Sequence, residues 1–263
     1  MSTHASFYRP AWLLLLCALL AALALPHAAH ASEVENTRRL AAQGDAVAQF
    51  RLGRMYYFGG RGVPQSHANA VRWYRAAAEQ GHAGAQNSLG LAYEFSQGVP
   101  QNHANAVRWY RAAAEQGYAR AQNNLGLMYE NGQGVPQNHA AAVRWYRAAA
   151  EQGHSFAQFF LGGMYDLGHG VPQNYATAVR WYRAAAEQGD AAAQHNLGLM
   201  YSTGDGVARN LVNAHMWTNL SAAQGNARAA KSRERIAQQM SPAQLAQAQR
   251  RASACLAANY RNC

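Results

Sequence analysis

Histidine is the residue type in this sequence whose spacing first suggests chemistry. His67, His103 and His139 recur 36 residues apart, and imidazole nitrogens can bind a metal ion or move a proton. Neighbouring helices pack about 8 to 10 Å apart, whereas zinc needs its ligand nitrogens at about 2 Å. Equivalent histidines in stacked units are therefore too far apart, and we predict no metal site. We expect these side chains to face solvent in the first turn of a helix.

Motifs for nucleophilic and phosphate chemistry are missing. The chain holds one lysine, Lys231, and the residue three positions before it is Arg228, so a Ser-x-x-Lys catalytic pair cannot form. Gly-x-Ser-x-Gly, His-Glu-x-x-His and a glycine-rich phosphate loop ending in lysine do not occur either. We predict that the protein is not an enzyme and uses no cofactor.

Cys255 and Cys263 lie near the end of the sequence. In an unbroken helix their α-carbons would be about 12 Å apart at 1.5 Å per residue, which exceeds disulfide reach. Pairing therefore requires the helix to end before Cys263. A disulfide and two unpaired or intermolecular thiols both stay open.

Residues 1–31 have the pattern of a secretory signal. Arg9 precedes an apolar run over residues 11–25, and Ala29-His30-Ala31 is a small-x-small cleavage site. The run is shorter than the roughly 20 residues that span a bilayer. We predict cleavage after Ala31 and a periplasmic or secreted chain with no stable membrane span; an uncleaved anchor is the alternative.

The net charge of the chain is +10 at pH 7. A strongly basic protein favours an acidic partner or surface. For an exported chain this points to an anionic polysaccharide, a lipid head group or an acidic protein, and away from nucleic acid.

Five copies of a 36-residue unit must position these residues. Each copy contains one marker tryptophan: Trp73, Trp109, Trp145, Trp181 and Trp217. Such a period is typical of stacked units that bury their apolar faces against one another. Apolar residues recur three and four positions apart in two stretches of each copy, which predicts two helices per unit.

The copies share Ala-Gln-x-x-Leu-Gly-x-Met-Tyr, then Gly-x-Gly-Val-Pro, then Ala-Val-x-Trp-Tyr-x-x-Ala-Ala-x-Gln-Gly. This signature resembles the Sel1-like repeat, a relative of the tetratricopeptide repeat. The resemblance implies an all-α, right-handed α-solenoid with a binding role. The predicted parts are a signal peptide (1–31), an N-terminal capping helix (32–43), repeats at 44–80, 81–116, 117–152, 153–188 and 189–224, and C-terminal capping helices (225–263).

Local signals place the helix ends. N-cap residues stand where each second helix should begin, at Ser66, Asn102, Asn138, Asn174 and Asn210. Glycines suited to a left-handed backbone stand where it should end, at Gly81, Gly117, Gly153, Gly189 and Gly225. Other glycines recur inside the first helices, at Gly53, Gly90, Gly126, Gly162 and Gly198. Because a mid-helix glycine costs about 1 kcal/mol, these predict close approach of the partner helix.

Two arginines recur in the second helix of the first four repeats. Arg75, Arg111, Arg147 and Arg183 each precede a glutamate by four residues, which predicts surface ion pairs. Arg72, Arg108, Arg144 and Arg180 have no such partner. The second set forms either a plain solvated face or an anion-binding stripe.

One side of the first helices varies between repeats while the core positions stay constant. In tetratricopeptide-type stacks this side lines the concave groove, which makes its residues candidates for protein binding. The candidates are Phe50, Arg54, Tyr57, Asn87, Glu94, Arg120, Asn123, Glu130, Phe156, Phe159, Asp166 and His195.

Phe50, Phe156 and Phe159 stand out on this otherwise polar or small side. They are either anchors for a partner, with Asn87 and Asn123 bonding its backbone, or fillers of packing gaps. We predict a protein-binding adaptor or regulator in the bacterial envelope. Binding of an anionic glycan by the unpaired arginines is the alternative.

Overall fold

A computed structural model describes residues 32–60, 62–260 and 263. The predicted signal peptide, residues 1–31, lies outside this part of the chain. Helices make up the fold, and the described residues contain no β-strand beyond an isolated bridge between Gly60 and Val63. None of the described helices combines the length and apolar character needed to cross a membrane.

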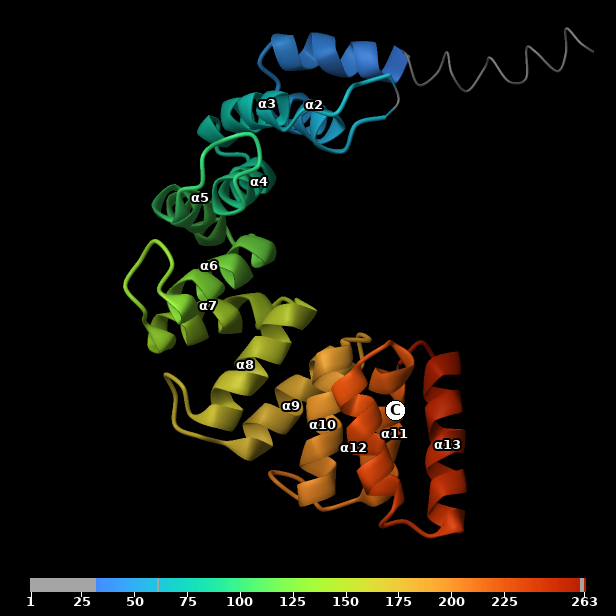
Figure 1. Ribbon diagram of the computed structural model, residues 1–263. Helices are drawn as coiled ribbons and strands as arrows, with labels where there is room; N and C mark the ends of the chain where they lie inside the picture. The colour runs from blue at the N-terminus through green and yellow to red at the C-terminus, as the bar shows by residue number, and fades with distance from the viewer. Residues whose placement is uncertain (1–31, 61, 261–262) are drawn as a thin grey trace, which may run out of the picture. The chain divides into compact units, whose positions relative to one another are not determined.

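The structure divides between Gln101 and Asn102 into an N-terminal unit and a C-terminal unit. The N-terminal unit contains a helix over residues 32–42, then α2 (Ala46–Phe58), α3 (His67–Glu79) and α4 (Ala83–Glu94). The C-terminal unit contains α5 (His103–Glu115), α6 (Ala119–Asn131), α7 (His139–Glu151), α8 (Ser155–Leu167), α9 (Tyr175–Ala186), α10 (Ala191–Thr203), α11 (Leu211–Ala223), α12 (Ala227–Ala237) and α13 (Pro242–Ala257). Within each unit consecutive helices pack against one another (Figure 1). The all-α solenoid of helix pairs that the repeats predict is confirmed.

The predicted helix ends are confirmed. The five N-cap side chains each accept a hydrogen bond from a backbone N–H three residues later. The terminal glycines have φ of 90°, 84°, 85°, 87° and 89°, the left-handed region. At the start of α8 a cap that the sequence did not suggest appears: Nδ1 of His154 accepts from the N–H of Ala157 at 3.3 Å.

The core of each of the first four repeats combines a leucine with alanines and one tyrosine of the second helix, and the fifth repeat has Thr218 in place of the tyrosine. Leu125, Leu161 and Leu197 are fully buried, as are Tyr146 and Tyr182. A Cβ atom added at Gly126 or Gly162 would lie 2.6 or 2.7 Å from a ring atom of the facing tyrosine. The close approach predicted for the mid-helix glycines is confirmed at Gly53, Gly126 and Gly162, where a tyrosine ring of the second helix is the cause, and at Gly198, where Thr218 takes the place of the tyrosine.

A buried glutamine ties each first helix of the C-terminal unit to two others. In α8, the Gln158 side-chain amide donates to the Ala150 carbonyl at 3.1 Å and its Oε1 accepts from Gln188 at 2.7 Å. Gln122 and Gln194 repeat this arrangement. Each of α6, α8 and α10 is therefore hydrogen-bonded through its glutamine at two places. One is the end of the preceding helix, and the other is the glutamine just after the helix that follows.

The predicted arginine–glutamate ion pairs are wrong. Arg111, Arg147 and Arg183 instead donate to the hydroxyls of tyrosines 18 residues later, at 2.8, 2.7 and 2.7 Å. Arg75 in the N-terminal unit does the same with Tyr93 at 2.9 Å. Stacking of the repeats places the first helix of the following repeat within hydrogen-bonding distance of the guanidinium group. The spacing of residues within a single helix could not predict this contact.

Helices α12 and α13 pack on α11 at the end of the C-terminal unit (Figure 1). A capping box of Ser241 and Gln244 is present at the start of α13. After α13 ends at Ala257, residues Asn259 and Tyr260 adopt positive φ. Cys263 then returns to Cys255, and the two form a disulfide with α-carbons 5.2 Å apart.

Candidate functional site

Helix α8 exposes a large apolar side chain near each of its ends, as the first helix α2 does with Val47 and Phe58. Phe156 at its start is 59% exposed and Leu167 at its end is 63% exposed. Between them Phe159 and Phe160 are half-buried. The apolar residues of α8 therefore extend well beyond its buried core face.

A pocket of about 320 Å³ opens beside this helix. Its residues come from α8 and from three neighbouring helices: Phe159, Phe160, Gly163, Met164, Asp166 and Leu167 of α8, His169 after it, Glu130 of α6, Tyr182 of α9 and Asn196 of α10. All of these lie in the C-terminal unit. The pocket is the place where the apolar surface of α8 meets polar groups.

Gly163 leaves the pocket open. The equivalent positions in the second, third and fifth repeats hold Leu91, Leu127 and Leu199. A Cβ atom added at Gly163 would have the hydroxyl of Tyr182 as its neighbour at 3.7 Å, an ordinary contact distance. A side chain would therefore fit here without a clash and would occupy space that the glycine leaves free.

Aromatic rings form one wall of the pocket. Phe160 stacks on Tyr146 with centroids 5.3 Å apart and an interplanar angle of 14°. Phe159 lies 5.3 Å from Phe160 and 6.0 Å from Tyr182. Because both tyrosines are fully buried, they hold the two half-exposed phenylalanines in fixed positions.

Two carboxylates complete the polar part. The hydroxyl of Tyr146 donates to Glu130 at 2.5 Å, and that of Tyr182 donates to Asp166 at 3.1 Å. The Tyr182 hydroxyl also hydrogen-bonds the side chain of Asn196. Burial, assisted by these carboxylates, raises the pKa of both tyrosines, so their hydroxyls stay protonated donors.

Asp166 is the more perturbed carboxyl. Burial raises its pKa above the ordinary value, the hydrogen bond from Tyr182 opposes this, and the charge of Asp205 adds to it. Among the described residues, neither Glu130 nor Asp166 forms an ion pair with an arginine, lysine or histidine. Their negative charges therefore face the pocket without a cation.

The predicted binding residues of the C-terminal unit divide into two groups. Glu130, Phe159 and Asp166 meet at the pocket, and Phe156 lies on the same helix. Arg120 is exposed on α6, and its charge, together with burial, lowers the pKa of His154.

Two further members of the predicted set, on α6 and α10, are buried and half-buried respectively. Asn123 is only 6% exposed, so its amide cannot bond a partner's backbone from this position. His195 bonds the hydroxyl of Ser232 on α12 at 3.1 Å, and burial lowers its pKa. The C-terminal helices cover this position, which the repeat pattern alone did not indicate.

In the N-terminal unit most of the predicted residues serve packing. Phe50 is half-buried against His82 at 4.6 Å and Tyr74 at 5.9 Å, which agrees with a gap-filling role. Tyr57 donates to Gln97 at 3.0 Å. Asn87 is 5% exposed and so cannot present its amide to a partner.

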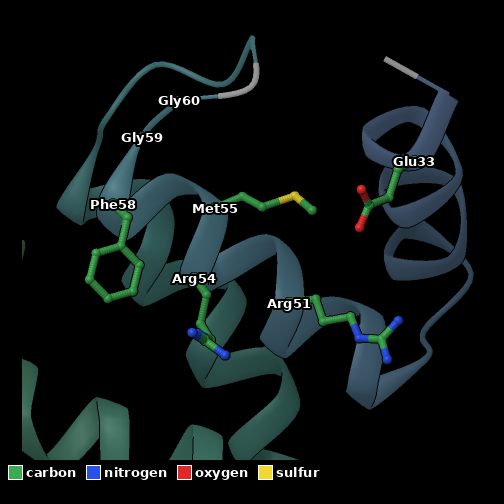
Figure 2. Close-up of a pocket in the computed structure, with 7 residues that line it drawn as sticks. All are labelled: Glu33, Arg51, Arg54, Met55, Phe58, Gly59 and Gly60. Atoms are coloured by element: carbon green, nitrogen blue, oxygen red, sulfur yellow. The ribbon is translucent and has the colours of Figure 1, made fainter. Parts of the chain in front are cut away.

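Glu94 is half-buried, while Arg54 is exposed on α2. Arg54 belongs to a second pocket, of about 410 Å³, whose other residues are Glu33, Arg51, Met55, Phe58, Gly59 and Gly60. Figure 2 shows Met55 and Arg51 directed toward the helix that carries Glu33, whereas Phe58 and Arg54 point away from it. The guanidinium of Arg54 lies 5.9 Å from the Phe58 ring centroid. This pocket is open, and it lacks the packed aromatic wall found beside α8.

The arginines without glutamate partners are exposed. Arg72, Arg108, Arg144 and Arg180 all lie at the surface. Arg108 and Arg180 sit over the rings of Trp109 and Trp181, each 5.2 Å from the centroid.

The prediction that His67, His103 and His139 face solvent is wrong. Each is half-buried, and each has a buried Nδ1 without a hydrogen-bond partner. The reason is a loop from the following repeat. Added Cβ atoms at Gly98, Gly134 and Gly170 would touch the carbonyl groups of these three histidines, so each loop packs on the first turn of the preceding second helix. No cluster of three His, Cys, Asp or Glu side chains in the described part of the chain could hold a metal ion.

Comparison with known proteins identifies the repeat. Five consecutive segments match the family model described as the Sel1 repeat: 46–82, 83–118, 119–154, 155–190 and 191–226. The chain belongs to the Sel1 repeat family. Sel1 repeat proteins generally mediate protein–protein interactions.

Two solved Sel1 repeat structures are similar at 40% identity or above. A Sel1 repeat protein from Oxalobacter formigenes is 40% identical with a TM-score of 0.68, and the match covers 73% of this chain and 76% of that one. A protective antigen present in uropathogenic Escherichia coli strains is 43% identical with a TM-score of 0.70 over 73% of this chain. The match spans 41% of the length of the Escherichia coli protein. No curated protein matches the chain.

Reasoning from the sequence missed several residues of the pocket in this Sel1 repeat protein. Phe160, Leu167 and Asn196 fall one helical position outside the side that was assigned to the groove. The signal that could have found them is the composition of Ser155–Leu167, which has three phenylalanines and two leucines in 13 residues. The ring of Tyr182 lies in the core, but this residue also lines the pocket.

Proposed function

We propose that this Sel1 repeat protein binds a protein partner through the pocket of α8 and the apolar residues that flank it. The observation that carries the proposal is the position of Phe156 and Leu167, both more than half exposed, on the helix that lines an open pocket. Exposed aromatic residues beside a pocket are typical of binding hot spots. Burying one such side chain contributes about 1.5–3 kcal/mol.

The arrangement fits a partner helix or extended segment lying along α8. Phe156 stands near the start of the helix, and Leu167 at its end lines the pocket. A segment that contacts both ends would place one side chain over the pocket. This is the mode in which a groove receives spaced anchor residues of a partner.

The setting that we propose is the bacterial envelope, with the protein acting there as an adaptor or regulator. Two features support export. Residues 1–31 have the pattern of a cleavable signal, and a disulfide such as that of Cys255 and Cys263 is typical of oxidising compartments. A signal-dependent reporter fusion tests this part: loss of the reporter's periplasmic activity on deleting residues 2–31 is expected, and cytoplasmic retention of the intact fusion would contradict export.

The binding proposal is tested by selecting ligands from a random-peptide phage library on the immobilised protein. Peptides enriched on the wild type should lose binding to Gly163→Leu, which fills the pocket with the residue found at positions 127 and 199. They should also bind Phe156→Ala more weakly. Phe95→Ala is the matched control, because Phe95 is a phenylalanine that is 58% exposed and does not line the pocket.

Circular dichroism must show that each variant keeps its helical content. Peptides that bind all variants equally, or that lose binding only to Phe95→Ala, would refute the assignment to α8. Enrichment of the same peptides in a selection on Gly163→Leu would refute it as well.

The exposed arginines support a second candidate, binding of an anionic glycan. Arg72, Arg108, Arg144 and Arg180 have no carboxylate partner among the described residues. Binding to immobilised alginate should then weaken steeply with added salt and should be lost when all four are changed to glutamine. Salt-dependent binding that survives these four substitutions would exclude this face.

A further inference from the structure

The pocket beside α8 combines two chemical features that together select a ligand group. We propose that the pocket receives a basic side chain, lysine or arginine, from the bound protein segment, an inference that rests on the proposed function. All the residues that carry it belong to the C-terminal unit.

Charge is the first feature. The whole chain has a net charge of +10, yet the pocket presents Glu130 and Asp166 with no cationic partner among the described residues. An unpaired carboxylate that becomes covered by a ligand loses its hydration, which costs several kcal/mol unless a cation compensates it. A neutral group would leave both charges uncompensated, and an acidic group would add repulsion.

The carboxylates are held in place and keep free acceptor capacity. Each accepts one hydrogen bond from a buried tyrosine, Glu130 from Tyr146 and Asp166 from Tyr182. A carboxylate has about four lone-pair sites, so each can still accept from an ammonium or guanidinium group. Asn196 fixes the Tyr182 hydroxyl in turn, which makes the acceptor arrangement rigid.

The aromatic wall is the second feature. Phe159 and Phe160 are half-buried and are stacked on the two buried tyrosines. The faces of aromatic rings attract cations, and the attraction increases when water is excluded. The methylene stem of a lysine or arginine can pack on such rings while its charged end reaches the carboxylates.

Two other titratable groups lie near the pocket, and neither forms an ion pair with Glu130 or Asp166. His169 lines the pocket and stacks on His139 at 5.2 Å, and Asp205 adds negative charge near Asp166. Burial raises the pKa of Asp166, in accordance with a carboxyl that lacks a positive partner in the free protein. A basic ligand is expected to lower this pKa on binding.

The test uses small probes that carry one side chain each. Nα-acetyl-lysine-N-methylamide and the corresponding arginine compound are titrated into isotope-labelled full-length protein, and NMR follows the backbone amide of Gly163 and the side-chain amide of Asn196. The norleucine compound is the control, because it has the same methylene stem without the charge. We expect the basic probes to shift both signals and to bind at least tenfold more tightly than norleucine.

Substitution of the carboxylates provides the second arm. Glu130→Gln with Asp166→Asn keeps acceptors for the two tyrosine hydroxyls and removes both charges. This variant should lose at least tenfold in affinity for the basic probes, whereas Glu151→Gln, which removes one exposed carboxylate of α7, should bind as the wild type does. Equal binding of lysine and norleucine compounds, or full retention by the double variant, would overturn the inference.

The outcomes separate this inference from the proposed function. If library peptides require Gly163 and Phe156 but bind the double variant as well as the wild type, the binding site stands and the basic side chain is wrong. If neither Gly163→Leu nor Phe156→Ala affects peptide binding while the basic probes still shift Gly163, the pocket accepts cations but does not dock the partner.

Discussion

Gly162 and Gly163 are adjacent in α8, and we expect alanine substitutions at the two positions to change stability in opposite directions. A Cβ at position 162 would lie 2.7 Å from a ring atom of Tyr182, which is 1% exposed. A Cβ at position 163 would lie 3.7 Å from the hydroxyl of the same residue. The two substitutions change the same helix by one methyl group each and differ in what that group meets.

The magnitudes follow from two terms. Replacing a mid-helix glycine with alanine favours the helix by about 1 kcal/mol at both positions. Overpacking a core costs about 1–3 kcal/mol, and the upper half of that range applies at position 162 because Asp166 and Asn196 both hold the Tyr182 hydroxyl. We therefore expect Gly162→Ala to lose about 1–2 kcal/mol and Gly163→Ala to gain about 0.5–1 kcal/mol.

Urea unfolding followed by circular dichroism measures both changes in the free energy of unfolding. Because a stack of repeats can unfold one part at a time, hydrogen exchange of the amides in α8 and α9 measures the local stability around the two glycines as well. A third variant locates the cause: Tyr182→Leu combined with Gly162→Ala should show a favourable coupling of about 1 kcal/mol or more, because the clash is removed. Shifts of the same sign and size for the two single variants, or no coupling to Tyr182, would refute the reasoning.

Three further predictions concern the rest of the C-terminal unit. Gln158→Leu should lower the free energy of unfolding by about 2–4 kcal/mol, because the buried carbonyl of Ala150 loses its hydrogen-bond partner. The exposed control Gln247→Leu should change it by no more than about 0.5 kcal/mol. Equal effects of the two substitutions in urea unfolding would contradict the role of the buried amide. Burial lowers the pKa of His215, so as the pH falls the unfolded chain takes up a proton at this residue before the folded chain does. The contribution of His215 to stability should be complete above the ordinary pKa of about 6.5 and should fall as the pH drops below it. Urea midpoints that are as pH-dependent in His215→Gln as in the wild type would exclude this residue as the cause. Cys263→Ser should increase hydrogen exchange near the end of α13 without changing exchange in α8, and unchanged exchange in α13 would show that the disulfide does not hold this end.

The fold was predictable from the sequence because its determinants are local and repeated. The N-cap residues, the left-handed glycines and the leucine and alanine spacing all act within one 36-residue copy, and five copies agree. Even the mid-helix glycines were interpretable, since repetition showed that a packing reason must exist. The side chain that supplies this reason belongs to the same repeat: it is a tyrosine at Gly53, Gly126 and Gly162, and Thr218 at Gly198.

The candidate site was only partly predictable, because its residues depend on contacts between copies. Phe159 and Asp166 were found from their place on the first helix, but Asn123 occupies an equivalent side and is buried. Arg147 was assigned to a glutamate on its own helix and bonds Tyr165 of the next one. His195 was assigned to an open surface, which α12 covers. The periodicity of the sequence predicts on which face of its helix a side chain lies. Whether that face is exposed to solvent depends on the contacts with neighbouring repeats and helices.

The glutamine bonds of the C-terminal unit also bear on how such a chain can change in length. Gln158 joins the end of α7 to the segment after α9, and Gln122 and Gln194 join the equivalent segments on either side. Because every junction uses the same donor and the same acceptors, duplicating or excising one 36-residue copy recreates identical junctions on both sides of the cut. The number of copies can therefore change without altering the junctions, and independently of the side chains that distinguish α8 from the other first helices.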